Sequence, residues 1–200
     1  MRKLLIFLAV LFVSVMSSAC INNFAIQELN TKAKEYLDKG DYDEAVKRLE
    51  SSVDLDGSVF ETRYNLAVAY VNKEEFKSAI NQLNEAIKIN PESADAYYTL
   101  GVALEGDGYK KLNDKKDTDE ETDIEADEKT PLFNTKEDAD YAINRLQDAI
   151  GAYTKYTEIA KNAGDLDKVN EHIKEIQKDI EEYSKLEFAE FEDTKADDKE

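Results

Sequence analysis

Residues 60–93 read FETRYNLAVAYVNKEEFKSAINQLNEAIKINPES, and the pattern of this stretch decides the fold. In each half, apolar residues recur three and four positions apart, which on a helix of 3.6 residues per turn makes one apolar stripe. The stripes consist of Leu66, Ala67 and Tyr70, then Phe76, Ala79, Ile80, Leu83, Ala86 and Ile87. A polar run at 72–75 separates them. The stretch therefore predicts two amphipathic helices joined by a tight turn.

Pro91 predicts where the second helix ends. Proline lacks a backbone donor and keeps the preceding Asn90 away from helical angles. A new helix can then begin after Ser93, a residue type that caps helix starts. The alanines on the buried stripes allow the two helices to pack closely, near the usual ~8–10 Å between axes.

The pattern recurs with a period of 34 residues. Ala33, Ala67 and Gly101 share one place in the period. Further matched sets are Tyr36, Tyr70 and Leu104, then Tyr42 with Phe76, Ala45 with Ala79, and Leu49 with Leu83. Because one helix pair cannot cover its own apolar face, repeated pairs are expected to stack.

This repeat resembles the tetratricopeptide repeat family. The resemblance is carried by Leu66-Ala67-x-x-Tyr70, Gly40-x-Tyr42-x-x-Ala45, Ala79, Ala86 and Pro91. It implies an all-α, right-handed superhelix of about three helix-turn-helix repeats with a C-terminal capping helix. An unrelated α-hairpin bundle is the alternative.

The N-terminal sequence and the repeats together divide the chain into a leader at 1–19, a tether at 20–25 and a repeat domain at 26–186. The repeats are expected at about 26–59, 60–93 and 94–162, followed by a capping helix at 165–186 and an acidic tail at 187–200. One face of the capping helix is apolar, consisting of Val169, Ile173, Ile176, Ile180 and Tyr183.

The third repeat is interrupted. From about 106 to 133 the apolar period disappears and charged residues dominate, so a disordered acidic insertion is expected. Thr135 then offers a helix cap. Either Ala142 or Ala149 fits the alanine place of the helix that follows.

The N-terminus is typical of an export signal. Arg2 and Lys3 precede a thirteen-residue apolar run, too short for the ~20 residues that span a bilayer. The following Ser17-Ser18-Ala19-Cys20 resembles the lipobox of bacterial lipoproteins, although that family prefers an aliphatic residue where Ser17 stands.

The lipobox resemblance implies diacylglycerol on Cys20, cleavage before it and an N-acyl group, such as palmitate, on the new N-terminus. It also implies a place at the bacterial cell envelope. Because Ile21 is not the aspartate that retains lipoproteins at the inner membrane, the periplasmic leaflet of the outer membrane is expected in a two-membrane cell. Otherwise the outer face of the cell membrane is expected. Ordinary cleavage after Ala19, leaving a soluble protein with one free thiol, is the alternative.

Composition argues against several partners. The chain has 45 acidic and 26 basic residues, for a net charge of −19, which makes nucleic acid and anionic headgroups poor partners. The sole histidine, His172, is expected to be a half-exposed surface residue. With no serine–histidine–aspartate set, zinc spacing or glycine-rich phosphate loop, the sequence predicts neither an enzyme nor a cofactor beyond the lipid on Cys20.

One acidic pattern resembles an EF-hand calcium loop. Its oxygen ligands would be Asp117, Asp119, Glu121, Asp123 and Glu128. Thr122 stands where the loop calls for glycine, and no clear helix enters it, so diffuse attraction of cations is expected. A secreted or surface-exposed structural protein with a cation-binding acidic loop is accordingly the second functional hypothesis.

The leading hypothesis is a scaffold that binds a protein or peptide partner. In the family, the first helices of successive repeats line a concave groove. By position, the groove residues are Asn30, Lys34, Tyr64, Asn65, Val68, Tyr98 and Val102. Asn65 matches the asparagine of the family's carboxylate clamp, but Asn30, Asp95 and Thr99 do not complete it, which disfavours a free carboxylate as ligand. Tyr64 and Tyr98 could instead pack between repeats.

Overall fold

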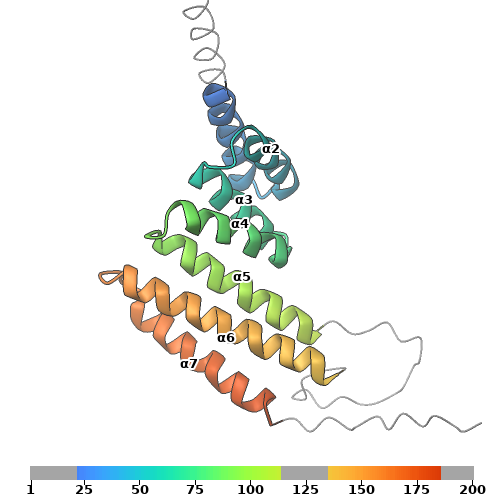
Figure 1. Cartoon of the computed structure of the whole chain (residues 1–200), viewed down its shortest axis with the longest axis vertical. Helices are drawn as coiled ribbons and strands as arrows, with labels where there is room; N and C mark the ends of the chain where they lie inside the picture. The colour runs from blue at the N-terminus through green and yellow to red at the C-terminus, as the bar shows by residue number, and fades with distance from the viewer. Residues whose placement is uncertain (1–21, 114–134, 186–200) are drawn as a thin grey trace, which may run out of the picture.

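The computed structural model describes residues 22–113 and 135–185, and within these ranges it contains helices and no strand. A first helix, described over 22–38, is followed by α2 (Tyr42–Leu55), α3 (Phe60–Asn72), α4 (Phe76–Ile89), α5 (Ala94–Asn113), α6 (Lys136–Ile159) and α7 (Leu166–Tyr183). Figure 1 shows them as a single pile of helices in chain order, with α7 at the end farthest from the first helix. The predicted all-α architecture of three helix pairs and a capping helix is confirmed.

The turns inside the first two repeats are copies of each other. Gly40 and Glu74, 34 positions apart, both have positive φ, of 75° and 57°. The next amide donates to the equivalent carbonyl in each turn, Asp41 to Tyr36 and Glu75 to Tyr70, both at 2.9 Å. The sequence period is therefore a period of backbone geometry as well.

The predicted helix ends are also confirmed. Helix α4 ends at Ile89, before Pro91, and the Ser93 hydroxyl then accepts the Ala96 amide at 3.3 Å. At the start of α6, the Thr135 hydroxyl accepts the Asp138 amide at 3.1 Å. Each side chain satisfies a backbone donor that the first turn of a helix leaves unpaired.

The core is layered along the pile. Ala33, Ala67, Ala79 and Ala86 are fully buried, so neighbouring helices approach closely where these residues meet. One cluster of buried side chains joins the first two repeats to the start of α5, and a second joins α5, α6 and α7. The apolar face of α7 closes the second cluster with Val169, Ile173 and Ile176, as predicted for a cap.

The third helix pair is longer than the sequence suggested. The acidic insertion was expected from about 106, but residues 106–113 continue α5, which has 20 residues against 13 in α3. Tertiary contacts explain the difference. Asp107 is only 7% exposed, accepts the Tyr141 hydroxyl at 2.5 Å and pairs with Arg145 at 3.2 Å, both from α6. The rest of the expected insertion, at 114–134, lies outside the described residues.

The contacts between α5 and α6 also show whether Ala142 or Ala149 occupies the alanine position of the third repeat's second helix. A methyl group added to Gly101, the third-repeat equivalent of Ala67, would lie 2.6 Å from the Tyr153 ring. One added to Gly108 would lie 3.3 Å from the Ala142 carbonyl. Ala142 therefore faces residues 106–113, which extend α5 beyond the length of α3. Ala149, one turn before Tyr153, faces the part of α5 that matches the first helices of the other repeats, so it has the repeat's alanine position.

The expected tether is shorter than predicted. Residues 22–25 were expected to connect Cys20 to the first repeat, but they form the start of the first helix. Burial of Ile26, 5% exposed, ties this turn to the pile. The leader, Cys20 and the acidic tail lie outside the described residues, and no helix in the described part is long and apolar enough to cross a membrane.

Candidate functional site

The predicted groove positions lie on three successive helices: the first helix, α3 and α5. Hydrogen bonds between these helices show that they are neighbours. The Asn30 amide donates to the Thr62 hydroxyl at 2.8 Å, and the Tyr64 hydroxyl lies 3.4 Å from that of Thr99. The residues fall at equivalent places of each helix, so they form one continuous surface.

Two of these residues are engaged in holding the pile together. Asn30 reaches Thr62, which is fully buried and lies 3.4 Å from the Ser52 hydroxyl. The Tyr64 ring stacks on Phe60 with centroids 5.9 Å apart. The Asn30 amide therefore bonds the first helix to α3, whereas the Tyr64 ring packs on a residue of its own helix and its hydroxyl approaches α5.

The other groove residues stay accessible. Tyr98 is 41% exposed even though its ring edge contacts Tyr153 and Tyr156. Lys34 is exposed, and Asn65 is half-buried with an amide that makes no hydrogen bond to another described residue. Val68 and Val102 lie between them, each half-buried. This set offers an aromatic ring, a free amide and apolar surface to a ligand.

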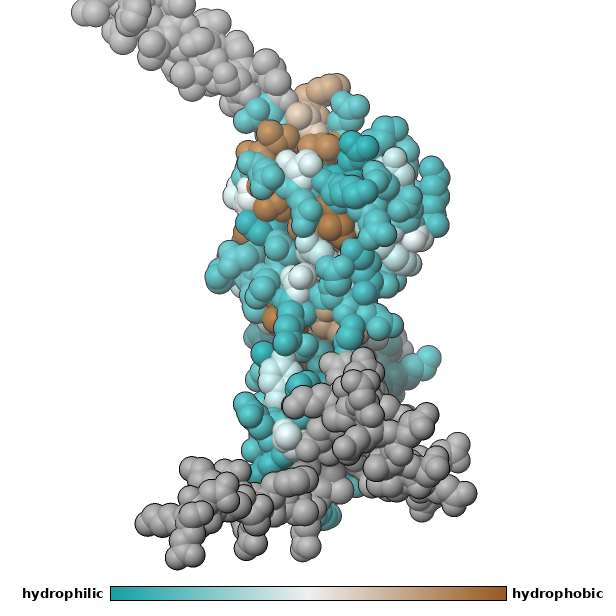
Figure 2. All heavy atoms as spheres, turned by 90° about the vertical axis from the view of Figure 1, so that its right-hand side faces the viewer, coloured by the Kyte–Doolittle hydropathy of each residue, from teal (hydrophilic) through white to brown (hydrophobic). Residues whose placement is uncertain are grey.

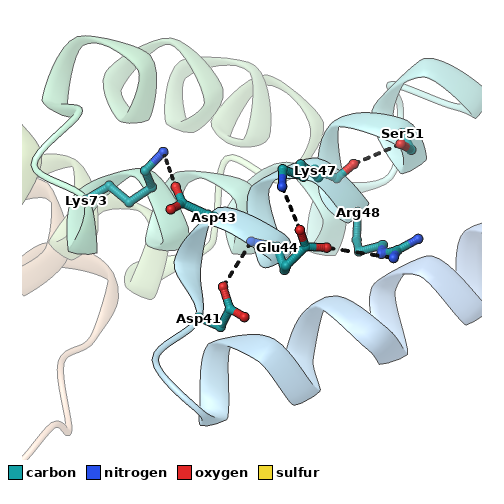
Figure 3. Close-up of polar contacts among 7 residues, drawn as sticks. All are labelled: Asp41, Asp43, Glu44, Lys47, Arg48, Ser51 and Lys73. Carbon is teal, nitrogen blue, oxygen red and sulfur yellow. Dashed lines mark hydrogen bonds and ion pairs between the residues drawn. The ribbon is translucent and has the colours of Figure 1, made fainter.

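The outer surface of α2 is different because its charges are paired with each other (Figure 3). Glu44 bridges Lys47 at 2.6 Å and Arg48 at 3.8 Å, while Asp43 pairs with Lys73 at 2.9 Å. The hydrogen bond from Lys47 lowers the pKa of the Glu44 carboxyl, and Lys73 does the same for Asp43. These exposed pairs add little stability, but they leave few uncompensated charges for a partner.

A second polar cluster, which sequence reasoning missed, joins α5, α6 and α7 around Glu105. Its carboxylate accepts the Tyr153 hydroxyl at 2.8 Å and contacts His172 Nε2 at 2.9 Å. His172 has the predicted half-exposed position, with 40% of its side chain accessible. These partners lie 48 and 67 residues from Glu105, so no local sequence pattern could have indicated the cluster.

Because His172 is part of this cluster, we expect the docking of α7 to depend on pH. Partial burial alone would lower the pKa of His172, but the hydrogen bonds and charges of Glu105 and Glu175 outweigh it and raise the pKa above 6.5. A raised folded-state pKa contributes stability that is present below the unfolded value and is lost as pH rises through the folded value.

We therefore expect His172→Gln to lower the free energy of unfolding below pH 6.5 and to have a smaller effect well above it. Because His172 is solvent-accessible, the difference should be a few tenths to about 1 kcal/mol. Urea unfolding of both proteins at the two pH values measures it, with Lys174→Gln, an exposed residue of α7, as the control. An effect of His172→Gln that is larger at high pH would contradict the assigned sign.

Two open pockets lie away from the groove, each with a volume of about 320 Å³. One lies between the start of α4 and the extension of the third pair and includes Phe76, Lys77 and Tyr141. Three carboxylates line it; Asp107 is held by Tyr141 and Arg145, and Glu75 pairs with Lys73. The other has an apolar floor that includes Leu100 and Leu104.

The described ranges contain no group of three histidine, cysteine or acidic residues arranged to hold a metal ion. The candidate calcium ligands from Asp117 to Glu128 lie outside those ranges. Cys20, the candidate lipid-attachment residue, lies outside them too.

The geometry defines a class of protein: a helical-repeat solenoid in which the first helices of successive pairs lie next to one another. The particular repeat is identified by family models. Residues 30–80 match the model described as tetratricopeptide repeat, and residues 69–108 match the one described as TPR repeat. Residues 30–108 thus match models of this repeat, and the fold of the described residues is an all-α superhelix of the same type.

Solved structures agree. The first TPR domain of human RPAP3 is 19% identical, with a TM-score of 0.54 over 80% of this chain and 94% of that one. The TPR2B domain of yeast Sti1, in complex with pHsp70, is 20% identical, with a TM-score of 0.52 over 78% and 98%. The type III secretion chaperone SycD of Yersinia enterocolitica, in complex with a peptide of the translocator YopD, is 11% identical, with a TM-score of 0.53 over 79% and 93%. No curated protein matches the chain in sequence. At these identities the likeness concerns the fold.

Proposed function

We propose that this protein is a non-catalytic adaptor, held at the bacterial cell envelope by lipid on Cys20, which binds a protein partner in the groove of its first helices. The observation that carries the proposal is the accessible set of Lys34, Asn65 and Tyr98 on neighbouring helices. The paired charges of α2 favour the groove over the outer surface as the binding site.

The groove fits an extended or helical protein segment. Tyr98 offers a rigid apolar ring, which binding surfaces use as an anchor, and Asn65 can hydrogen-bond a peptide backbone. The Sti1 and SycD structures are complexes with pHsp70 and with a YopD peptide, which supports a peptide-like partner here.

A free C-terminal carboxylate is not the expected ligand. Asp95 and Thr99 stand at places of the family's carboxylate clamp. The Thr99 hydroxyl donates to the Asp95 carbonyl at 2.8 Å, and the Asp95 side chain is exposed and carries a negative charge that would repel a carboxylate. We therefore propose that an internal segment of the partner binds.

The anchor half of the proposal comes from the sequence. A short apolar run after two basic residues, followed by Ser17-Ser18-Ala19-Cys20, supports cleavage before Cys20 and acylation of it. Several acyl chains make attachment stable where one would be marginal. In a two-membrane cell, Ile21 favours the periplasmic leaflet of the outer membrane, and in a single-membrane cell the outer face of the cell membrane.

The second hypothesis, a structural protein with a cation-binding acidic loop, depends on residues 117–128. They lie outside the described residues, and nothing in the described residues favours it.

One experiment tests both halves of the adaptor proposal. Proteins are cross-linked in intact cells, membranes are separated from the soluble fraction, and the cross-linked partner is quantified. Truncating a central contact of an interface typically costs about 2 kcal/mol, or roughly a 30-fold loss of affinity. We expect Asn65→Ala combined with Tyr98→Ala to remove the partner while leaving the protein in the membrane fraction.

Asn81→Ala is the matched control, because Asn81 is an exposed amide on the outer helix α4. It should retain the partner. Cys20→Ala should leave uncut or soluble protein. Partner yield that is equal in the groove and control variants would exclude the groove, and unchanged membrane retention of Cys20→Ala would exclude the anchor.

A further inference from the structure

The end of the pile where the chain enters carries the most exposed large hydrophobic side chain of the described ranges, Phe24. Phe24 is 69% exposed, against 41% or less for the other exposed large hydrophobic residues of the described ranges. Figure 2 shows hydrophobic side chains gathered at this end of the molecule, beside the N-terminal segment, whereas most of the remaining surface in that view is hydrophilic. An exposed phenylalanine ring is stabilised by roughly 1.5–3 kcal/mol if it is fully buried.

The length of chain between Phe24 and Cys20 limits what can cover this ring. Four residues span at most about 14 Å even when fully extended. The polar interface of one leaflet is about 5–7 Å thick outside the hydrocarbon core. If Cys20 carries lipid, Phe24 therefore cannot lie far from the bilayer surface.

The charge pattern agrees with such a position. Residues 21–27 contain no charged side chain, and Glu28 is the first charge after Cys20. The six of these residues that the structure describes as helical, 22–27, rise about 9 Å, close to the depth at which interfacial helices are buried. The negative charge of the chain begins only at Glu28, one helical turn after Phe24, so the first turn itself brings no acidic side chain among the headgroups.

We infer that the N-terminal end of the first helix is a membrane-docking surface, with the Phe24 ring inserted among the lipid headgroups. This inference rests on the proposed lipidation of Cys20. It fixes an orientation: the first helix meets the membrane, and the repeats stack away from it, with α7 farthest from the bilayer (Figure 1). The groove then faces the aqueous space, where a partner can reach it.

Tryptophan fluorescence tests the inference, because the chain contains no tryptophan. Phe24→Trp and Tyr98→Trp each introduce one probe, the first at the docking surface and the second in the groove on α5. The full-length gene is expressed, and the protein is extracted from membranes with its anchor. It is then reconstituted into vesicles of zwitterionic phosphatidylcholine with or without brominated acyl chains.

We expect bromolipid to quench the tryptophan at position 24 at least twofold and the one at position 98 negligibly. Acrylamide in the water should show the reverse order. Equal acrylamide quenching at both positions, with no effect of bromolipid, would overturn the docking surface. Protection of position 24 from acrylamide without bromolipid quenching would overturn it too, because a protein would then cover the ring.

Retention on the vesicles is measured in the same samples by flotation. Protein that floats but fails the quenching test excludes the docking surface and leaves the lipid anchor standing. Protein that cannot be obtained in membrane-bound form excludes the anchor, and the docking surface with it.

Discussion

Replacement of Leu83 by alanine is expected to lower the free energy of unfolding by about 2–5 kcal/mol. Leu83 is fully buried on α4, in the cluster that joins the first two repeats to α5. Its loss leaves a cavity that the surrounding helices cannot fill completely. In a stack whose repeats contact only their neighbours, a defect in the middle also weakens both interfaces of that repeat.

Ile89→Ala is the matched control, since Ile89 belongs to the same helix but is 40% exposed. It removes a similar volume of aliphatic side chain and should cost less than about 1 kcal/mol. Urea unfolding followed by circular dichroism at 222 nm measures both variants. Equal effects at the two positions would mean that the repeats do not share the layered core described above.

The second large effect is expected at Gly101, where alanine should lower the free energy of unfolding by about 1–2 kcal/mol. The added methyl group would lie 2.6 Å from the Tyr153 ring. That ring cannot move easily, because it is 2% exposed and its hydroxyl is bonded to Glu105. The strain exceeds the gain of roughly 1 kcal/mol that alanine brings to a helix interior.

Gly151→Ala tests the same chemical change where there is space. Gly151 lies within α6, and nothing would lie within 4 Å of an added methyl group. Helix propensity then acts alone and should raise stability by about 0.5–1 kcal/mol. The opposite signs of the two glycine variants are the result to check, by thermal unfolding. A stabilising Gly101→Ala would show that α5 and α6 are farther apart than the structure places them.

The third helix pair sets this solenoid apart from a regular array. The extension of α5, residues 106–113, carries two residues that bind later helices. Asp107 accepts a hydrogen bond from Tyr141 of α6, and the Tyr109 hydroxyl donates to Asp179 of α7 at 2.5 Å. The two helices of the third pair, α5 and α6, therefore contact each other over a greater length than the helices of the second repeat do. Such an end is suited to closing the stack, because a terminal repeat lacks a neighbour on one side.

The predicted groove residues share places in the repeat but differ in their surroundings. Equivalent places at 30, 64 and 98 follow from the period, but their roles differ because their neighbours differ. Asn30 meets a buried threonine and Tyr64 meets Phe60, whereas the exposed part of Tyr98 is left free by Tyr153 and Tyr156. A repeat predicts which residues share a surface, and only the packing around each one decides whether it remains available.

Local sequence by itself determined the helix pairs, their 34-residue period, the turns and the caps. These depend on residues within one or two turns of each other, such as Pro91 after α4 and Thr135 before α6, and short-range sterics and hydrogen bonding act without the rest of the chain. Tertiary structure alone decided that α5 continues to Asn113, that the first helix includes residues 22–25, and that Glu105 joins Tyr153 and His172. Those features depend on contacts between residues far apart in the chain, where burial and pairing outweigh local preference for a turn or an unfolded segment.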